Sequence, residues 1–160
     1  MKQGTTLFLK IAVFIIGTPV LALCIFGLPW LAKDTAESGS ELAYLVYGIL
    51  AVMYVSAIPF FVALYQAFKL LSYIDMSKAF SELSVRALKY IKYCAITIST
   101  LYVLGMPLFY LMAEADDAPG IILIGMVIIF ASMVIAVFAA VLQRLLQEAI
   151  NIKSENDLTV

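Results

Sequence analysis

Three basic residues near the middle of the chain have the spacing of one charged helix face. Arg86, Lys89 and Lys92 recur every three residues, with leucine and isoleucine between them. Residues three or four apart are neighbours on a helix surface. Such a cluster attracts anionic lipid headgroups, at about 1 kcal/mol per charge near a membrane surface. With Lys78 it could instead dock a cytosolic protein, and the sequence leaves both roles open.

Residues suited to acid–base, nucleophilic or metal chemistry are scarce. Histidine is absent, and the two cysteines, Cys24 and Cys94, match neither a disulfide framework nor a metal site. General acid–base catalysis uses histidine or carboxylates with shifted pKa values. Glu114, Asp116 and Asp117 form a cluster typical of a solvated turn, with cation binding as the alternative. We therefore expect no enzymatic activity, no cofactor and no metal.

Four long stretches of the chain contain no Asp, Glu, Lys or Arg, and the helices that they form must position the charged clusters. They cover residues 11–32, 42–68, 93–113 and 118–143. A helix crosses the bilayer core of roughly 30 Å with about 20 mostly apolar residues, and one charge at its centre costs about 2.5–3.5 kcal/mol. The chain is 64% hydrophobic, with a mean hydropathy of +1.06. The sequence predicts an all-α fold, an integral membrane four-helix bundle forming a single domain.

The expected spans are slightly longer than the uncharged stretches. They run over about residues 8–32, 42–70, 88–113 and 118–145. A loop at 71–87 and a tail at 146–160 are expected in the cytoplasm. Lys2 and Lys10 precede the first apolar stretch as in a signal peptide, but the stretch continues through Trp30. We expect the first span to remain in the protein as a membrane helix and not to be cleaved as a signal peptide.

Three helices are expected to extend beyond the bilayer. The second can continue to about Ile74, the third can begin near Ser81 as an N-cap, and the fourth can run from Pro119 to about Lys153. Each would have about 32–35 residues, or roughly 50 Å at 1.5 Å per residue. Tilted helices with frayed ends are the alternative.

The distribution of Lys and Arg predicts the orientation. The central connection, 69–92, has five of these residues, and the two connections on the other side have one between them. Short cytoplasmic loops collect Lys and Arg. We expect both termini on the cytoplasmic side of a bacterial inner membrane.

A weak internal repeat relates the two halves of the chain. Gly27-Leu28-Pro29 in the first span resembles Gly105-Met106-Pro107 in the third, 78 residues later. Two copies of a helical hairpin with one orientation would be related by an axis along the membrane normal. Chance similarity between apolar stretches is the alternative.

Prolines and polar residues inside the spans are few. Pro59 and Pro107 are expected to kink their helices, because proline removes a backbone donor. The spans otherwise contain a few hydroxyl and amide side chains: Ser56, Thr97, Ser99, Thr100, Ser132, Gln66 and Gln143. Small hydroxyl residues in membrane helices commonly pack helices together or bond their own backbone.

Three segments together resemble a known family. They are 58–71, with Ile58-Pro59-Phe60-Phe61; 78–91, with Lys78-Ala79-Phe80-Ser81; and 152–160, which ends Glu-Asn-Asp-Leu-Thr-Val. The chain resembles the YoaS-type bacterial membrane proteins, a family with a domain of unknown function. The resemblance implies four spans and a gene often placed beside one for an Xre-type helix-turn-helix regulator. It implies no catalytic residues.

The most concrete functional hypothesis is regulatory. The polar tail with Glu155, Asn156 and Asp157, together with the basic segment, would dock or sequester the helix-turn-helix regulator, and the chain itself would not bind nucleic acid. A small transporter or channel subunit is the first alternative, and immunity to a membrane-active peptide toxin is another. Membrane lipids are expected partners, and homo-oligomerisation is left open.

The expected orientation can be measured by cysteine labelling. After replacement of Cys24 and Cys94, single cysteines at the termini and at position 78 should be protected from an impermeant reagent in intact cells. Cysteines at positions 37 and 116 should react. Protection of position 116 would overturn the orientation.

Overall fold

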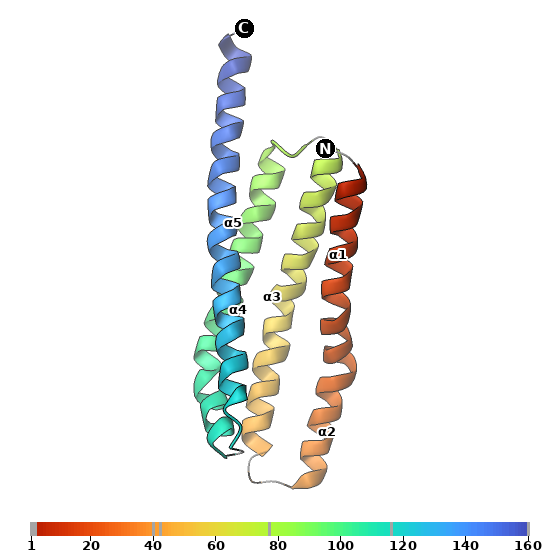
Figure 1. The fold of residues 1–160 in the computed structure, drawn as a ribbon, viewed down its shortest axis with the longest axis vertical. Coiled ribbons are helices and arrows are strands. Elements are labelled where there is room, and N and C mark those ends of the chain that lie inside the picture. The colour runs from red at the N-terminus through yellow and green to blue at the C-terminus, as the bar shows by residue number, and fades with distance from the viewer. Residues whose placement is uncertain (1–2, 40, 42, 77, 116, 160) are drawn as a thin grey trace.

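The computed structural model describes residues 3–39, 41, 43–76, 78–115 and 117–159, with only the backbone for 3, 38 and 157–159. The helical elements are α1 (Gln3–Ala22), η1 (Leu23–Gly27), α2 (Leu28–Ser38), α3 (Ala43–Asp75), α4 (Glu82–Ala115) and α5 (Gly120–Thr159). Within these described ranges there is no strand. The elements α1, η1 and α2 follow one another as a single rod (Figure 1).

Four helices are long and apolar enough to cross a membrane. They are Gly4–Glu37, Ala43–Asp75, Glu82–Ala115 and Gly120–Asn156 in the described part of the chain. The prediction of an all-α, four-span fold is confirmed. Both chain termini and the connection between α3 and α4 lie at one end of the bundle (Figure 1), which we call the terminal end.

The helices extend beyond the uncharged stretches, as expected. The end of α3 at Asp75 and the start of α4 at Glu82 agree closely with the predicted Ile74 and Ser81. The fourth span is longer than predicted, because α5 continues past Lys153 to Thr159. Its 40 residues correspond to about 60 Å, so α5 projects beyond the other helices at the terminal end (Figure 1).

The first span contains a π-helical turn, which the sequence did not predict. The N–H of Leu28 donates to the carbonyl of Leu23, five residues back. This leaves the Cys24 carbonyl without its usual helical donor, and the Tyr54 hydroxyl of α3 donates to it at 2.9 Å. The turn directly precedes Pro29, whose ring in an α-helix would clash with the carbonyl four residues back. A neighbouring helix thus satisfies the backbone group that the π turn releases.

The helices pack unevenly. α3 packs closely on α4, and α4 on α5, whereas α1 and α2 contact chiefly α3. Small residues allow the close approach, as is typical of membrane helices. A Cβ atom on Gly105 would lie 3.1 Å from Val52 Cγ2, and one on Gly48 would lie 2.9 Å from Leu108 Cδ1.

The proline kinks and the hairpin repeat are two predictions that the packing of the helices does not test. α3 continues as a helix through Pro59 and α4 through Pro107, so kinks at these prolines stay predictions. The hairpin repeat also stays a prediction. Its two proposed halves differ in packing, because α4 and α5 contact each other far more extensively than α1 and α3.

The tight contact at Gly105 can be tested by substitution. Gly105→Leu should lower the melting temperature in detergent, because overpacking costs about 1–3 kcal/mol and the β-branched Val52 cannot easily move. Gly120→Leu is the matched control, since no described atom beyond its chain neighbours and its own helix backbone lies within 4 Å of a Cβ atom there. Equal melting temperatures for the two variants would contradict the close packing of α3 on α4.

Candidate functional site

The predicted basic residues lie at the terminal end of α4 and in the connection before it. Arg86, Lys89 and Lys78 have exposed side chains, and Lys92 is half-buried, with its Nζ 4.7 Å from the centre of the Tyr93 ring. The backbone of Lys78 has a structural role. Its N–H donates to the carbonyl of Tyr73 at 2.7 Å, and its carbonyl accepts the hydroxyl of Ser81 at 2.5 Å and that of Ser84 at 3.1 Å.

A polar depression between α4 and α5 brings Lys92 together with Gln143 and with three residues that the sequence did not single out. Its polar lining comes from five residues: Lys92, Gln143, Arg144, Gln147 and Glu148. Arg144 and Glu148 form a loose, exposed pair at 3.9 Å. The Oε1 atom of Gln143 is buried without a hydrogen-bond partner among the described residues. Two cations from different helices thus lie near one surface, partly balanced by Glu148.

The two parts of the predicted docking surface lie at different heights along the bundle. Gln147 Nε2 donates to Glu82 Oε1 at 3.0 Å, which places the start of α4 level with Gln147. Arg86 then lies about 6 Å further into the bundle and Glu155 about 12 Å further out, at 1.5 Å per residue. Glu155 and Asn156 are exposed on the projecting helix, and the side chain of Asp157 lies outside the description. The structure therefore does not merge the two groups into one patch.

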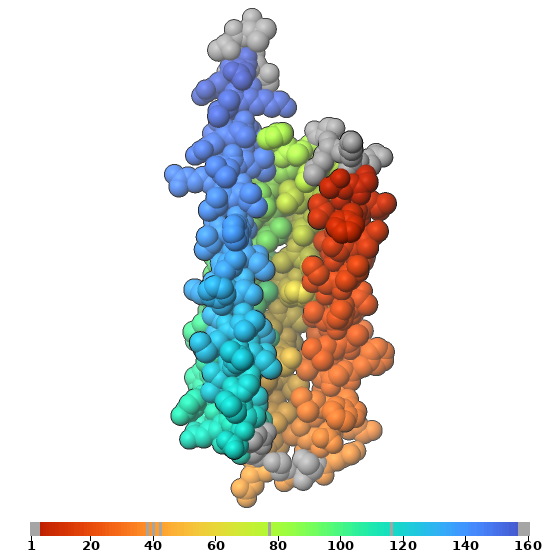
Figure 2. All heavy atoms as spheres, viewed as in Figure 1, coloured from red at the N-terminus to blue at the C-terminus, as the bar shows by residue number. Residues whose placement is uncertain are grey.

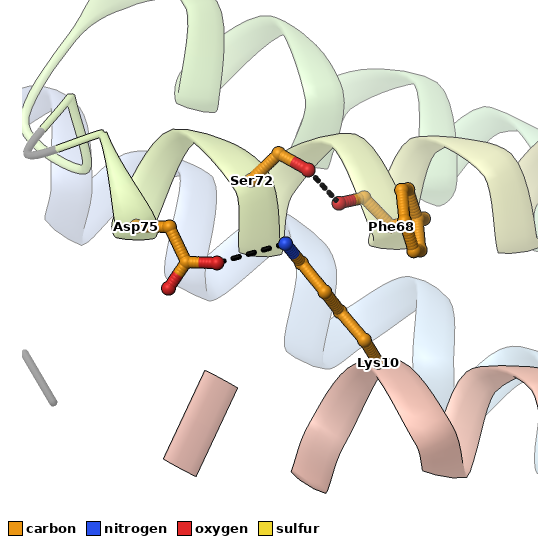
Figure 3. Close-up of polar contacts among 4 residues, drawn as sticks. All are labelled: Lys10, Phe68, Ser72 and Asp75. Atoms are coloured by element: carbon orange, nitrogen blue, oxygen red, sulfur yellow. Dashed lines mark hydrogen bonds and ion pairs between the residues drawn. The ribbon is translucent and has the colours of Figure 1, made fainter. Parts of the chain in front are cut away.

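The ends of the bundle contain two further charged features. At the terminal end, Lys10 of α1 forms a salt bridge with Asp75 of α3 at 2.8 Å (Figure 3), and their side chains are only 21% and 22% exposed. At the opposite end, Glu114 and Asp117 are exposed, while Asp116 lies outside the described residues. Within the described ranges, no three His, Cys, Asp or Glu side chains form a group that could hold a metal ion.

Lys10 is held by more than its ion pair. Its Nζ atom lies 5.3 Å from the centre of the Phe68 ring, and Phe14 meets the same ring edge-on at 5.7 Å between centroids. The fully buried Thr6 also interacts with the Asp75 carboxylate. These contacts attach the start of α1 to the end of α3, and Figure 3 shows Lys10, Phe68 and Asp75 among the residues involved. The sequence could not indicate this pair, because 65 residues separate its members.

Between the helices lies a partly open cavity of about 580 Å³, which we call the central cavity. All four spans line it, and none of its lining residues is charged. Ser56, Tyr102 and Ser132 provide its hydroxyl groups. The sequence indicates only that the two serines pack helices together or bond their own backbone. It does not indicate a cavity, because a cavity depends on how the helices are arranged.

The arrangement of four long apolar helices, with charged groups at their ends, defines a multi-pass membrane protein. The family model described as "Protein of unknown function (DUF2975)" matches residues 30–160, and the chain belongs to this family. It is 69% identical over 160 residues to the "Uncharacterized membrane protein YoaS" of Bacillus subtilis (strain 168), with 100% of both chains covered. The resemblance to YoaS-type proteins is thereby confirmed. No solved structure matches the chain.

The attachment of α1 to α3 can be tested at the ion pair. Asp75→Asn should lower the melting temperature in detergent, because it removes the charged partner of a largely buried ammonium. Glu148→Gln is the matched control, since its pair with Arg144 is long and exposed and should contribute little. The exchange Lys10→Asp with Asp75→Lys should recover part of the loss. An unchanged melting temperature for Asp75→Asn would contradict a stabilising role.

Proposed function

We propose that this membrane protein has a regulatory, non-enzymatic role and docks or sequesters a small cytosolic helix-turn-helix regulator. The observation that supports the proposal is the projection of α5 beyond the rest of the bundle (Figure 1). In this proposal the terminal end faces the cytoplasm, in agreement with the Lys and Arg of the central connection. A helix that stands clear of the membrane offers its side chains to a soluble partner.

The side chains on the projecting end of α5 are suited to binding in a groove of a partner protein. Residues 151–156 are all exposed, and most are polar or charged. Ile152 is the only large apolar side chain among these six and is 59% exposed. Helix-in-groove recognition uses apolar anchors on one helix face, and charged neighbours set the register. Ile152 would be the anchor, and Glu155 would meet a basic residue of the partner.

The basic residues of α4 can contribute to the same docking event. Arg86 and Glu155 are separated by about 18 Å along the bundle axis, from the helical rise. A compact domain of about 100 residues has a radius of gyration of roughly 13 Å, so a single small regulator can span both. Lipid headgroups would occupy Arg86, Lys89 and Lys92 when no partner is bound.

The central cavity favours a second candidate function, that of a small transporter or channel subunit. It is lined by all four spans, as a substrate site at the bilayer midplane would be. Against this candidate, no charged residue of the described part of the chain lines the cavity, whereas ion-coupled transport generally uses intramembrane charges. Solute flux into proteoliposomes would distinguish transport from docking.

The docking role can be tested by shortening α5. Removal of residues 155–160 should leave membrane abundance unchanged, because the deletion lies outside the apolar stretch that directs insertion. Co-purification of the helix-turn-helix protein should be lost and expression of its target genes altered. The wild-type complex should weaken from low to high salt, because salt screens exposed ion pairs.

Two variants separate the contributions of charge and sequence. A chain with residues 155–160 in scrambled order keeps their composition and should also lose the partner if their pattern is recognised. Ile152→Ser should weaken co-purification if this side chain is the anchor. Retention of the partner and of regulation by the shortened chain would rule out docking through this segment. If no cytosolic protein co-purifies with the wild type, transport becomes the better candidate.

A further inference from the structure

The walls of the central cavity are suited to an uncharged molecule. The cavity volume of about 580 Å³ lies within the range of roughly 300–1,000 Å³ that is typical of small-molecule sites. It is far larger than the packing voids that protein interiors contain. Apolar side chains form most of its surface, so a charged headgroup would lose its hydration without gaining a partner.

The hydroxyl groups that line this cavity lie at a similar height along the bundle. Ser56 Oγ lies 2.9 Å from the Met53 carbonyl oxygen and 3.2 Å from the Tyr102 hydroxyl oxygen. Serine has one hydrogen to donate, so donation to Met53 makes the phenol the donor to Ser56. The Tyr102 oxygen then has acceptor capacity towards the cavity. Ser56, Tyr102 and Ser132 lie 13, 13 and 12 residues from the helix ends opposite the terminal end, which are Ala43, Ala115 and Gly120.

The hydroxyl group of Ser132 also indicates that the cavity holds a ligand. Its side chain lines the cavity and belongs to a residue only 7% exposed. Thr97 and Thr100 donate to the carbonyls of Tyr93 and Ile96, four residues back. Ser132 makes no such bond within the described part of the chain. A hydroxyl group that faces an apolar cavity without a partner is unfavourable, and an oxygen atom in the cavity would accept its hydrogen.

The cavity has a route to the surrounding lipid. α1 and α5 both line it but do not pack against each other to any appreciable extent. In the space-filling view a furrow runs between α1 and α5, and α3 is visible at its base (Figure 2). A molecule dissolved in the bilayer can approach through this furrow without crossing water.

We infer that the central cavity is a binding site for a neutral lipid with one hydroxyl or carbonyl oxygen. The chain of the lipid lies along the apolar walls, and its oxygen accepts a hydrogen bond from Ser132. A hydroxyl group on the ligand would also donate to Tyr102. A phospholipid headgroup does not suit this site, because it is charged and lies at the membrane surface while the hydroxyl residues lie at mid-depth. This site is separate from the proposed docking surface and does not depend on it.

Photolabelling with two matched probes tests the site. The full-length protein is reconstituted in vesicles of phosphatidylglycerol and phosphatidylethanolamine and labelled with a diazirine-bearing fatty alcohol or with the corresponding alkane. Mass spectrometry should locate the alcohol label on peptides that line the cavity, and unlabelled alcohol should compete. Ser132→Ala should reduce alcohol labelling about two- to tenfold, the effect of one hydrogen bond, and leave alkane labelling unchanged.

Substitutions that fill the cavity provide the second test. Ala57→Leu on α3 and Ala131→Leu on α5 place a larger side chain in the cavity from different walls and should abolish labelling at the lining peptides. Ala51→Leu is the matched control, because Ala51 is on α3 but exposed on the outer surface. Melting temperatures identify any variant that fails to fold, and Ser132→Ala introduces no added bulk.

Several results would overturn the inference. One is equal labelling by alcohol and alkane that does not respond to Ser132→Ala. Another is labelling that survives both filling substitutions in folded protein. Cross-links between copies of the chain at the lining peptides would show that a second protomer occupies the furrow, and this too would refute a lipid site.

Discussion

The bilayer interior contains no water that could satisfy a peptide group, and this constraint determines the rest of the structure. Every backbone N–H and C=O in the spans must bond within the protein, so the uncharged stretches form continuous helices. The first span departs from α geometry only at Leu23–Gly27, before Pro29. There Tyr54 donates to the released Cys24 carbonyl, so the irregular turn depends on α3.

The same constraint explains how the first span can pack so loosely. A transmembrane helix that satisfies its own backbone needs few contacts with its neighbours, and lipid covers its apolar side chains as well as protein would. α1 is attached at the terminal end through Lys10 and Asp75. At its other end, α2 leads into α3 through a short connection at Gly39, whose φ of 61° suits glycine. Attachment at both ends leaves room for the cavity between them.

The sequence was sufficient to predict the four spans and most helix ends, because charge and apolar length determine which segments can enter the bilayer. It underestimated α5, because the bilayer does not determine where a helix ends in water. The pair Lys10–Asp75 and the cavity at Ser132 depend on which helix faces meet. Apolar membrane helices give little information about this, because lipid-facing and protein-facing positions have similar residue types. The π turn was missed because the same proline can be accommodated by a simple kink.

The continuity of α5 has a mechanical consequence. One helix without a break lines the cavity at Ser132 and carries Glu155 beyond the bundle. These residues are 23 positions apart, or about 35 Å at 1.5 Å per residue. A tilt of about 5° around Ser132 would therefore displace Glu155 by about 3 Å, on the same helical rise. Because the helix is continuous, a small change in its tilt at the cavity would become a larger displacement at Glu155.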